Sequence, residues 1–330
     1  MKKLLRIEVC VLAVVLLTVL VIGIVKGPSA PAPSVTEPSE PTAPITDPTA
    51  PIGPMFPADF VPTWNTYPDN RNVRARQYFV YDCDAEQFLI VSGQPMKVYP
   101  ASITKLFTAY VALKYLDPSR QVTAGNALDL VSWDSSVAYI RKGDVLTVEQ
   151  LVEAMLLPSG NDAAYILACE AGRTIWSNPN MSPTDAVKAF MERVNYHLLA
   201  EGMSGTNLVT PDGIHKYDHY TCFEDLSQIG KLAIEHPVIG KYAAEPRKEL
   251  VLHGETLVWK NTNALINPDS DYYCPYALGL KTGYTGAAGN CLLSAFQVGD
   301  RELIIGVFGC PASSDRFDDT LQLFNQIALY

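Results

Sequence analysis

Segments with the pattern of β-strands occur in two groups of this 330-residue chain, one early and one late, and the region between them has helical periodicity. The early group is a predicted hairpin, residues 78–81 and 88–91 joined by a polar turn. The late group comprises residues 249–252, 256–259, 278–281, 291–296 and 302–308, followed by an amphipathic helix at 314–328. This order predicts an α/β (α+β) fold in which both chain ends build one sheet around an inserted helical lobe, at about residues 118–236. A functional cleft is expected between sheet and lobe.

Capping residues mark the starts of helices in the lobe. Thr147 and Gln150 have the spacing of a capping box ahead of the apolar residues 148–157. Thr221 and Glu224 are expected to cap a later helix in the same way. These signals predict that the lobe consists of several separate helices.

Residues 9–25 form an uncharged apolar run with three basic residues before it and Lys26 after it. This pattern fits a short membrane-spanning anchor or a secretory signal. We favour an uncleaved anchor, because prolines interrupt the small residues near 29–32 where a signal peptidase would cut. Residues 1–26 carry four basic residues and one glutamate, a net charge of +3, which places the N-terminus in the cytoplasm and the rest outside a single-pass cell-membrane protein. In the alternative, the signal is cleaved and the protein is secreted.

Eleven prolines lie within residues 28–62, many of them three positions apart. A polyproline II helix repeats every three residues, so the pattern predicts a stiff extracellular linker over residues 27–64 ahead of a folded region at 65–330. A docking site for a proline-binding module is the other interpretation. The whole chain has a net charge of −10, which leaves −13 beyond the +3 of residues 1–26 and argues against nucleic acid as a partner.

Ser102 and Lys105 stand three residues apart at the start of an apolar helical segment that ends near Pro118. Side chains at positions i and i+3 share one face of a helix, so this hydroxyl and this amine can meet. Serine is a weak nucleophile until a neighbouring group takes its proton. A lysine with its ordinary pKa of about 10.4 is almost fully protonated at neutral pH, and it can act as the base only if burial and a nearby cation lower that pKa. The pair therefore predicts a nucleophile and its base, and it requires a second cation.

Two further short motifs could supply the rest of an active site. Ser159-Gly160-Asn161 lies in a turn between two predicted helices, and Lys281-Thr282-Gly283 ends an apolar strand. Each motif alone is common by chance, but each occurs once here, in this order and in a suitable local setting.

The segments around these motifs closely resemble the low-molecular-mass penicillin-binding proteins that are D-alanyl-D-alanine carboxypeptidases, serine peptidase family S11. The matching segments are residues 100–105, 156–163 and 280–289, and the resemblance extends over about residues 75–330. It implies a β-lactamase/transpeptidase-like fold, with a mainly antiparallel sheet flanked by helices and an inserted all-helical lobe. It also implies a penicillin-binding D,D-carboxypeptidase that removes the terminal D-Ala from peptidoglycan stem pentapeptides, is inhibited by β-lactams, and uses no metal and no cofactor.

The resemblance implies a catalytic role for each matching residue. Ser102 attacks the carbonyl of the penultimate D-Ala, and Lys105 takes the proton of its hydroxyl. Ser159 relays a proton to the departing D-Ala, while Asn161 orients Lys105 and the peptide backbone. Lys281 lowers the pKa of Lys105.

Substrate binding is implied for the strand that carries Lys281. Lys281 and Thr282 bind the terminal carboxylate of the substrate, and Gly283 belongs to the same segment. The backbone N–H groups of Ser102 and Tyr284 form an oxyanion hole, a type of site in which each donor stabilises the transition state by about 3 kcal/mol.

Other functions remain open at the level of the sequence. A D,D-endopeptidase or transpeptidase would pass the acyl group to an amine or cleave a cross-link with the same residues. A β-lactamase is less favoured, because the sequence has no E-x-x-L-N segment to supply a deacylating glutamate. A wall-binding protein without catalysis is the alternative from another class.

Three sets of residues near or outside the motifs are left without a function. The family often has histidine where this chain has Asp212, so Asp212 is left out of the predicted site. His215 and His219 have metal-ligand spacing, but a hydrogen-bonded loop is the favoured interpretation. The cysteines are scattered, and they are equally compatible with buried free thiols and with one or two disulfides.

Overall fold

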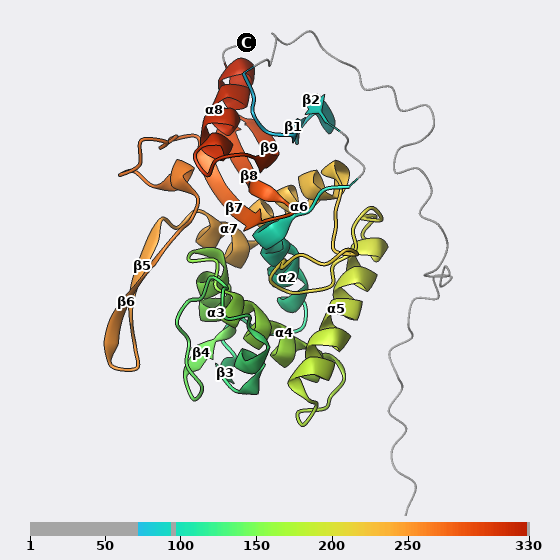
Figure 1. The fold of residues 1–330 in the computed structure, drawn as a ribbon, viewed down its shortest axis with the longest axis vertical. Coiled ribbons are helices and arrows are strands. Elements are labelled where there is room, and N and C mark those ends of the chain that lie inside the picture. The colour runs from blue at the N-terminus through green and yellow to red at the C-terminus, as the bar shows by residue number, and fades with distance from the viewer. Residues whose placement is uncertain (1–71, 94–96, 329–330) are drawn as a thin grey trace, which may run out of the picture. The chain divides into compact units, whose positions relative to one another are not determined.

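The computed structural model describes residues 72–93 and 97–328, and the predicted anchor and linker lie outside these residues. Within this part no helix is long and apolar enough to cross a membrane. Its centre is a five-stranded antiparallel sheet of order β2-β1-β9-β8-β7. The strands are β1 (Gln77–Asp82), β2 (Gln87–Ser92), β7 (Ala277–Thr285), β8 (Gly289–Val298) and β9 (Arg301–Cys310). Because β1 pairs with β9 (Figure 1), the prediction that both chain ends build one sheet is confirmed.

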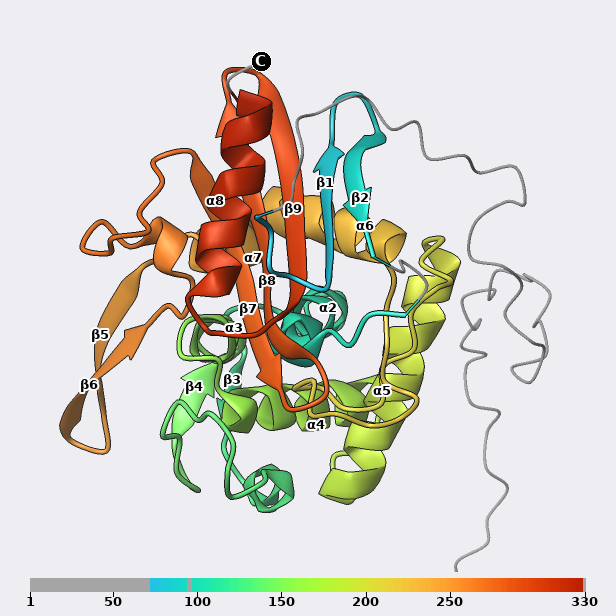
Figure 2. The ribbon, with the colours of Figure 1, turned by 45° about the horizontal axis from the view of Figure 1, so that its top comes forward.

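Both faces of the sheet are covered. Successive strand residues point to opposite faces, so Leu293 packs toward the helical lobe while Leu292 packs toward the C-terminal helix α8 (Asp315–Ala328). On the α8 face, which Figure 2 shows from the side of that helix, the rings of Phe296 and Phe324 stack with their centroids 4.4 Å apart. Because side chains on both faces are buried, the sequences of β8 and β9 are nearly continuous apolar runs and do not alternate between apolar and polar residues.

The lobe is built mainly from helices. They are α2 (Thr104–Ala112), α3 (Val148–Leu156), α4 (Asn161–Ile175), α5 (Pro183–Ala200), α6 (Phe223–Glu235) and α7 (Pro237–Ala243). The predicted capping box is confirmed, since Gln150 N donates to Thr147 Oγ1 at 3.1 Å and Thr147 N donates to Gln150 Oε1 at 2.8 Å. The predicted cap of α6 is wrong. Cys222 occupies the N-cap position without a side-chain cap, and the Thr221 hydroxyl instead hydrogen-bonds that of Thr206 at 2.7 Å.

The lobe is not entirely helical. Strands β3 (Gln121–Thr123) and β4 (Val145–Thr147) form a separate two-stranded antiparallel sheet. Their middle residues Val122 and Leu146 are buried while most of the flanking side chains are exposed. A strand of three residues gives one buried position, too few to create a recognisable alternation, so sequence periodicity missed this sheet.

Another pair of strands, β5 (Arg247–Leu252) and β6 (Glu255–Lys260), forms the predicted hairpin but stands apart from the main sheet (Figure 1). Its side chains fix it to the segment that leads into the cleft. Trp259, which is 2% exposed, donates from Nε1 to the carbonyl of Ala138 at 3.0 Å. Strands β5 and β6 therefore pack against the lobe and are not part of the central sheet.

All six cysteines in the described residues are buried and free. Burial raises the pKa of each of these thiols, including Cys291 to about 11. Of the two interpretations left open by the sequence, the structure supports buried free thiols for these six residues.

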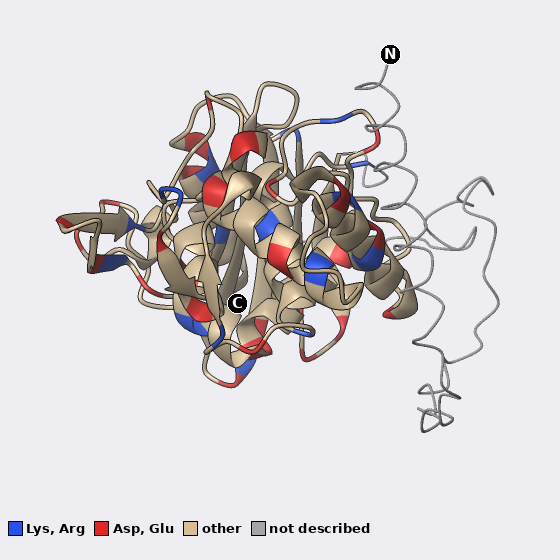
Figure 3. Ribbon diagram, turned by 90° about the horizontal axis from the view of Figure 1, so that it is seen from below, with Lys and Arg blue, Asp and Glu red and all other residues tan. Residues whose placement is uncertain are grey.

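Charged residues of both signs are interspersed along the elements of the described unit (Figure 3). Several form ion pairs across element boundaries, such as Lys114 with Glu201 and Lys241 with Glu149, each at 2.9 Å. Ion pairs near the surface stabilise a fold by only about 0–1 kcal/mol each.

Candidate active site

Ser102 lies in a single 3₁₀ turn, Ala101–Ile103, which leads directly into α2. The turn is packed tightly, because Ala101 and Ile103 are almost fully buried and Ile103 N donates to Pro100 O at 3.1 Å. The first residues of α2 place Lys105 one turn later, with its Nζ 2.9 Å from Ser102 Oγ. The predicted nucleophile and base are therefore in hydrogen-bond contact.

The Lys105 amine is fully buried and has three hydrogen-bond partners. Its Nζ lies 2.9 Å from Ser102 Oγ, 2.8 Å from Asn161 Oδ1 and 2.9 Å from the carbonyl oxygen of Asp212. Burial lowers the pKa of Lys105 to about 8, against the opposing effect of the negative charges of Asp212 and Asp162. A neutral amine has two protons and one lone pair. The amide and the carbonyl can only accept these protons, so the lone pair faces the one partner that can donate, the Ser102 hydroxyl.

Ser159 and Asn161 come from the turn between α3 and α4. Ser159 has a backbone φ of +63°, and Gly160 is followed at once by Asn161, the first residue of α4. Asn161 N donates to Ser136 O at 2.8 Å, which fixes the turn to the wall of the cleft that contains Ser136. The buried carboxylate of Asp162 secures the same wall, because its oxygens accept from Ala138 N and Ile140 N at 2.9–3.1 Å. Both sets of contacts tie the turn to one segment, residues 136–140, and Ser159 lines the cleft.

The strand β7 supplies the other side of the site. Lys281 is 1% exposed, and its Nζ donates at 3.2 Å both to Thr262 Oγ1 and to the carbonyl of Thr282. Burial lowers the pKa of Lys281 strongly, and the positive charges of Lys105 and Arg316 lower it further. The structure therefore places the predicted second cation beside the first. Burial, and not the charge of Lys281, accounts for the lowered pKa of Lys105, so the role predicted for Lys281 in lowering that pKa stays a prediction.

The end of β7 packs directly against the Ser102 turn. A Cβ atom added at Gly283 would lie 2.9 Å from the carbonyl oxygen of Pro100 and 3.1 Å from Ser102 N, so only glycine allows this approach. Tyr284 follows with a side chain that is 64% exposed. The backbone at Ser102 and at Tyr284 therefore borders one cleft, as the proposed oxyanion hole requires.

The cleft between lobe and sheet has a volume of about 530 Å³. Predicted residues that line it are Ser102, Ser159, Asn161, Thr282, Gly283 and Tyr284, while the side chains of Lys105 and Lys281 lie buried directly behind. Residues that were not predicted to lie there also line it, among them Asp212, His215, Thr262, Arg316, Ser132 and residues 134–136. Thr262 was missed because its role depends on a contact across 20 residues, a 2.6 Å hydrogen bond from Thr282 Oγ1 to Thr262 Oγ1.

Arg316 is the most important of the missed residues. It lies in the first turn of α8, and its guanidinium reaches the cleft, donating to Gly283 O at 3.4 Å and to Ser313 Oγ at 3.0 Å. Within the described residues its buried Nε has no hydrogen-bond partner. No spacing pattern marks this residue in the sequence, because an arginine in an amphipathic terminal helix is ordinary. The structure adds a third cation next to Lys281.

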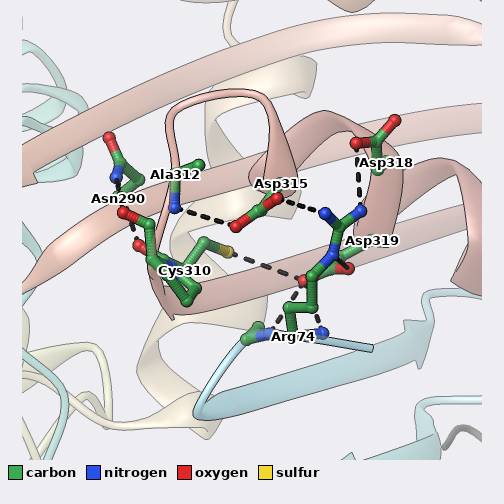
Figure 4. Close-up of polar contacts among 9 residues, drawn as sticks. Arg74, Asn290, Cys310, Ala312, Asp315, Asp318 and Asp319 are labelled. Atoms are coloured by element: carbon green, nitrogen blue, oxygen red, sulfur yellow. Dashed lines mark hydrogen bonds and ion pairs between the residues drawn. The ribbon is translucent and has the colours of Figure 1, made fainter. Parts of the chain in front are cut away.

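The start of α8 is fixed to the beginning of the described chain by Arg74 (Figure 4). The guanidinium pairs with Asp315 at 2.5 Å and with Asp318 at 3.1 Å, and the backbone N–H groups of Arg74 and Ala75 donate to Asp319 Oδ2 at 3.0 and 2.8 Å. The three aspartates that make these contacts flank Arg316 in the sequence. They hold the turn from which Arg316 extends toward the cleft.

The two histidines with metal-ligand spacing point to different partners. His219 is 1% exposed, and its Nε2 lies 2.8 Å from Thr104 Oγ1, while His215 borders the cleft with its ring 4.7 Å from that of Tyr99. Within the described residues no cluster of three or more His, Cys, Asp or Glu side chains has the geometry of a metal site. The arrangement at the cleft is suited to acyl transfer through a serine.

A family comparison matches residues 64–312 to the model of the D-alanyl-D-alanine carboxypeptidases, peptidase family S11. The chain belongs to this family. All three motifs lie within the matched region, so the S11 assignment and the geometry of the site agree.

Relatives and solved structures support the S11 assignment. D-alanyl-D-alanine carboxypeptidase DacF of Bacillus subtilis is 24% identical over 73% of this chain and 59% of its own length. D-alanyl-D-alanine carboxypeptidase of Streptomyces sp. K15 is 30% identical over 68% of this chain and 77% of its own. The crystal structure of the Streptomyces K15 DD-transpeptidase superposes with a TM-score of 0.70 at 26% identity, covering 79% of this chain and 98% of that one. The chain spans about three fifths of the length of DacF and of Escherichia coli DacC.

Proposed function

We propose that this protein is a serine-type D-Ala-D-Ala carboxypeptidase that removes the terminal D-Ala from peptidoglycan stem pentapeptides through an acyl-enzyme on Ser102. The observation that carries the proposal is the environment of Lys105 Nζ. Two of its three hydrogen-bond partners, the Asn161 amide oxygen and the Asp212 carbonyl, can only accept, so the lone pair of the neutral amine can accept a proton only from the Ser102 hydroxyl. Membership of the S11 family supports the choice of substrate.

We infer the following steps of acylation for these groups. Lys105 takes the proton of Ser102 as Ser102 Oγ bonds to the carbonyl carbon of the penultimate D-Ala. The carbonyl oxygen becomes an oxyanion and is bound by the backbone N–H groups of Ser102 and Tyr284. When the peptide bond breaks, the Ser159 hydroxyl gives its proton to the nitrogen of the departing D-Ala and takes back a proton from the Lys105 ammonium, so both side chains return to their starting state. Water then releases the acyl group and restores the Ser102 hydroxyl.

Recognition of a free C-terminus is assigned to the cations at the end of β7. Lys281, Thr282 and Arg316 surround one corner of the cleft, and Arg316 Nε is buried without a hydrogen-bond partner among the described residues. A substrate carboxylate placed there would accept charge-assisted hydrogen bonds, which are about twice as strong as neutral ones. This requirement restricts cleavage to the last residue of a peptide.

A D,D-transpeptidase is the second candidate. It is favoured by one observation, the similarity to the Streptomyces K15 DD-transpeptidase, with a TM-score of 0.70. Transpeptidation uses the same acyl-enzyme and differs only in the acceptor, an amine in place of water. A D,D-endopeptidase, a β-lactamase and a wall-binding protein without catalysis are weaker candidates.

The test is release of D-Ala from diacetyl-Lys-D-Ala-D-Ala by the purified full-length chain and by its Ser102→Ala variant. We expect release by the parent chain and none by the variant. Adding glycine as an acceptor amine separates the first two candidates. A transpeptidase joins the diacetyl-Lys-D-Ala group to glycine, whereas a carboxypeptidase transfers it to water and releases diacetyl-Lys-D-Ala. Rapid turnover of a fluorescent penicillin would indicate a β-lactamase. If the parent chain neither releases D-Ala nor is labelled by the penicillin, the enzymatic function is refuted.

We also propose that residues 65–330 form the catalytic domain and that residues 9–25 anchor it to the outer face of the cell membrane, with residues 27–64 as a spacer. The basic residues before the apolar run and the extended proline spacing support this arrangement. N-terminal sequencing of the protein isolated from cells tests it. A sequence that began near Ala30 would mean a cleaved signal and a secreted enzyme.

A further inference from the structure

Asp212 occupies a position next to the base that the mechanism above does not use. Its backbone carbonyl accepts the 2.9 Å hydrogen bond from Lys105 Nζ, its side chain is buried, and it borders the cleft. The next residue, Gly213, has a φ of +86°, and a Cβ atom added there would overlap the carbonyl oxygen of Ala101. The segment that carries Asp212 is therefore pressed against the Ser102 turn and cannot move independently of it.

The Asp212 carboxylate is poorly satisfied by hydrogen bonds. Oδ1 accepts from Ile214 N at 3.1 Å, whereas Oδ2 is buried and has no partner within the described residues. The other carboxylate behind the cleft, Asp162, accepts from the N–H groups of Ala138, Ile140 and Ala163. A buried carboxylate without such donors is stabilised chiefly by nearby positive charge.

Charged and titratable groups from every neighbouring element face this region. They are Lys105 on α2, Asp162 and Tyr165 on α4, Lys281 on β7, Arg316 on α8, and His215 and His219 on the segment after Asp212. Burial lowers the pKa of His219 to about 4, so this histidine is neutral near pH 7. Of the potential cations, Lys105 hydrogen-bonds the backbone carbonyl of Asp212, and the negative charge of the Asp212 carboxylate raises the pKa of this amine.

We propose that Asp212 is a positioning residue for Lys105, whose carboxylate stabilises the ammonium form of the base while its carbonyl fixes the amine. The inference rests on the proposed function. During acylation the Ser102 proton moves to Lys105 Nζ as the bond from Ser102 Oγ to the substrate carbonyl forms. Positive charge therefore develops on the amine that the Asp212 backbone carbonyl holds, where the charge of the Asp212 carboxylate acts on it. That charge lowers the energy of the transition state. It also keeps Lys105 protonated to a higher pH in the resting enzyme.

These two effects oppose each other in the Asp212→Asn variant and give it a distinctive pH profile. Without the carboxylate the Lys105 pKa falls further below about 8, so more of the amine is neutral and competent at pH 6–7. The same amine is a weaker base and its ammonium is less stabilised, so acylation at alkaline pH is slower. The profiles of parent and variant should therefore cross.

The experiment measures the second-order rate of acylation of the full-length chain by a fluorescent penicillin from pH 5.5 to 10. For Asp212→Asn we expect the midpoint of the acid limb to move down by about 1 pH unit and the alkaline plateau to fall about threefold. Asp212→Glu retains the charge and should keep the parent midpoint. Asp129→Asn removes the same charge from an exposed residue that pairs with Lys142, and it should behave as the parent does.

The midpoint does not depend on how much of a variant is folded, so a loss of stability does not mimic the predicted shift. Coincident midpoints, or an equal fall in rate at every pH, would overturn the inference while leaving the proposed function intact. Complete loss of labelling by Asp212→Asn at pH 10, where the base is neutral in either protein, would also overturn it. A parent chain that is not acylated at any pH would refute the proposed function itself.

Discussion

Thr104 Oγ1 and His219 Nε2 lie 2.8 Å apart in the interior, although 115 residues separate them in the chain. The Nδ1 atom of the same ring accepts from Val209 N at 3.0 Å, which places the imidazole proton on Nε2, where it is donated to Thr104. One neutral histidine thus joins the start of α2 to the segment that carries Asp212. The residue next to Thr104 is Lys105, so this contact helps to fix the base.

His219 should make stability depend on pH. Burial lowers its pKa to about 4, below the value of about 6.5 expected in the unfolded chain. Between these values the unfolded chain binds the additional proton, so the stabilisation is complete above pH 6.5 and is lost as the pH falls toward 4. The loss amounts to about 3 kcal/mol. Urea unfolding of the parent and of His219→Asn measures it, and the variant should lack this part of the slope. Equal slopes would show that His219 is not the group responsible.

Arg316→Gln should impair recognition of the substrate carboxylate more than the chemistry at Ser102. We expect kcat/KM for diacetyl-Lys-D-Ala-D-Ala to fall by about 10- to 100-fold, because hydrogen bonds to a charged group are worth about 1.5–3 kcal/mol. Hydrolysis of the corresponding C-terminal amide, which lacks the carboxylate, should change little. Steady-state kinetics with both peptides tests this. An equal loss for the two would assign Arg316 a structural role instead.

Gly213→Ala should destabilise the fold by about 3 kcal/mol or more, since it combines a positive φ with an overlap against Ala101. Gly143→Ala is the matched control. Gly143 has a φ of +95° with nothing within 4 Å of the added Cβ, so only the backbone strain of about 1 kcal/mol is expected there. Denaturant unfolding compares the two. If Gly213→Ala cost no more than Gly143→Ala, the close packing of this segment against the Ser102 turn would be in doubt.

The sequence was sufficient to predict those parts of the site that depend on local spacing. Ser102 and Lys105 meet because one turn of backbone brings them together, and Asn161 is close in the sequence to Ser159. The antiparallel sheet could be predicted because β8 and β9 are long and strongly apolar. In these cases the relevant physical interaction acts over a few residues.

The parts that sequence patterns missed depend on contacts between distant residues. Arg316 reaches the cleft only because α8 packs on the sheet, and Thr262 is brought to Lys281 by the return of the chain into β7. Asp212 has no pattern around it that distinguishes a carboxylate behind a catalytic lysine from one in an ordinary turn. Its importance is visible only when burial and hydrogen-bond partners are known.

The most direct test of the account is to identify the residue that a β-lactam acylates. The full-length chain is treated with benzylpenicillin, its intact mass is measured, and the modified peptide is sequenced by mass spectrometry. The account predicts one added penicillin per chain, located on Ser102, and none on the Ser102→Ala variant. An adduct on Ser159 or another residue, or an equal adduct on the variant, would contradict it.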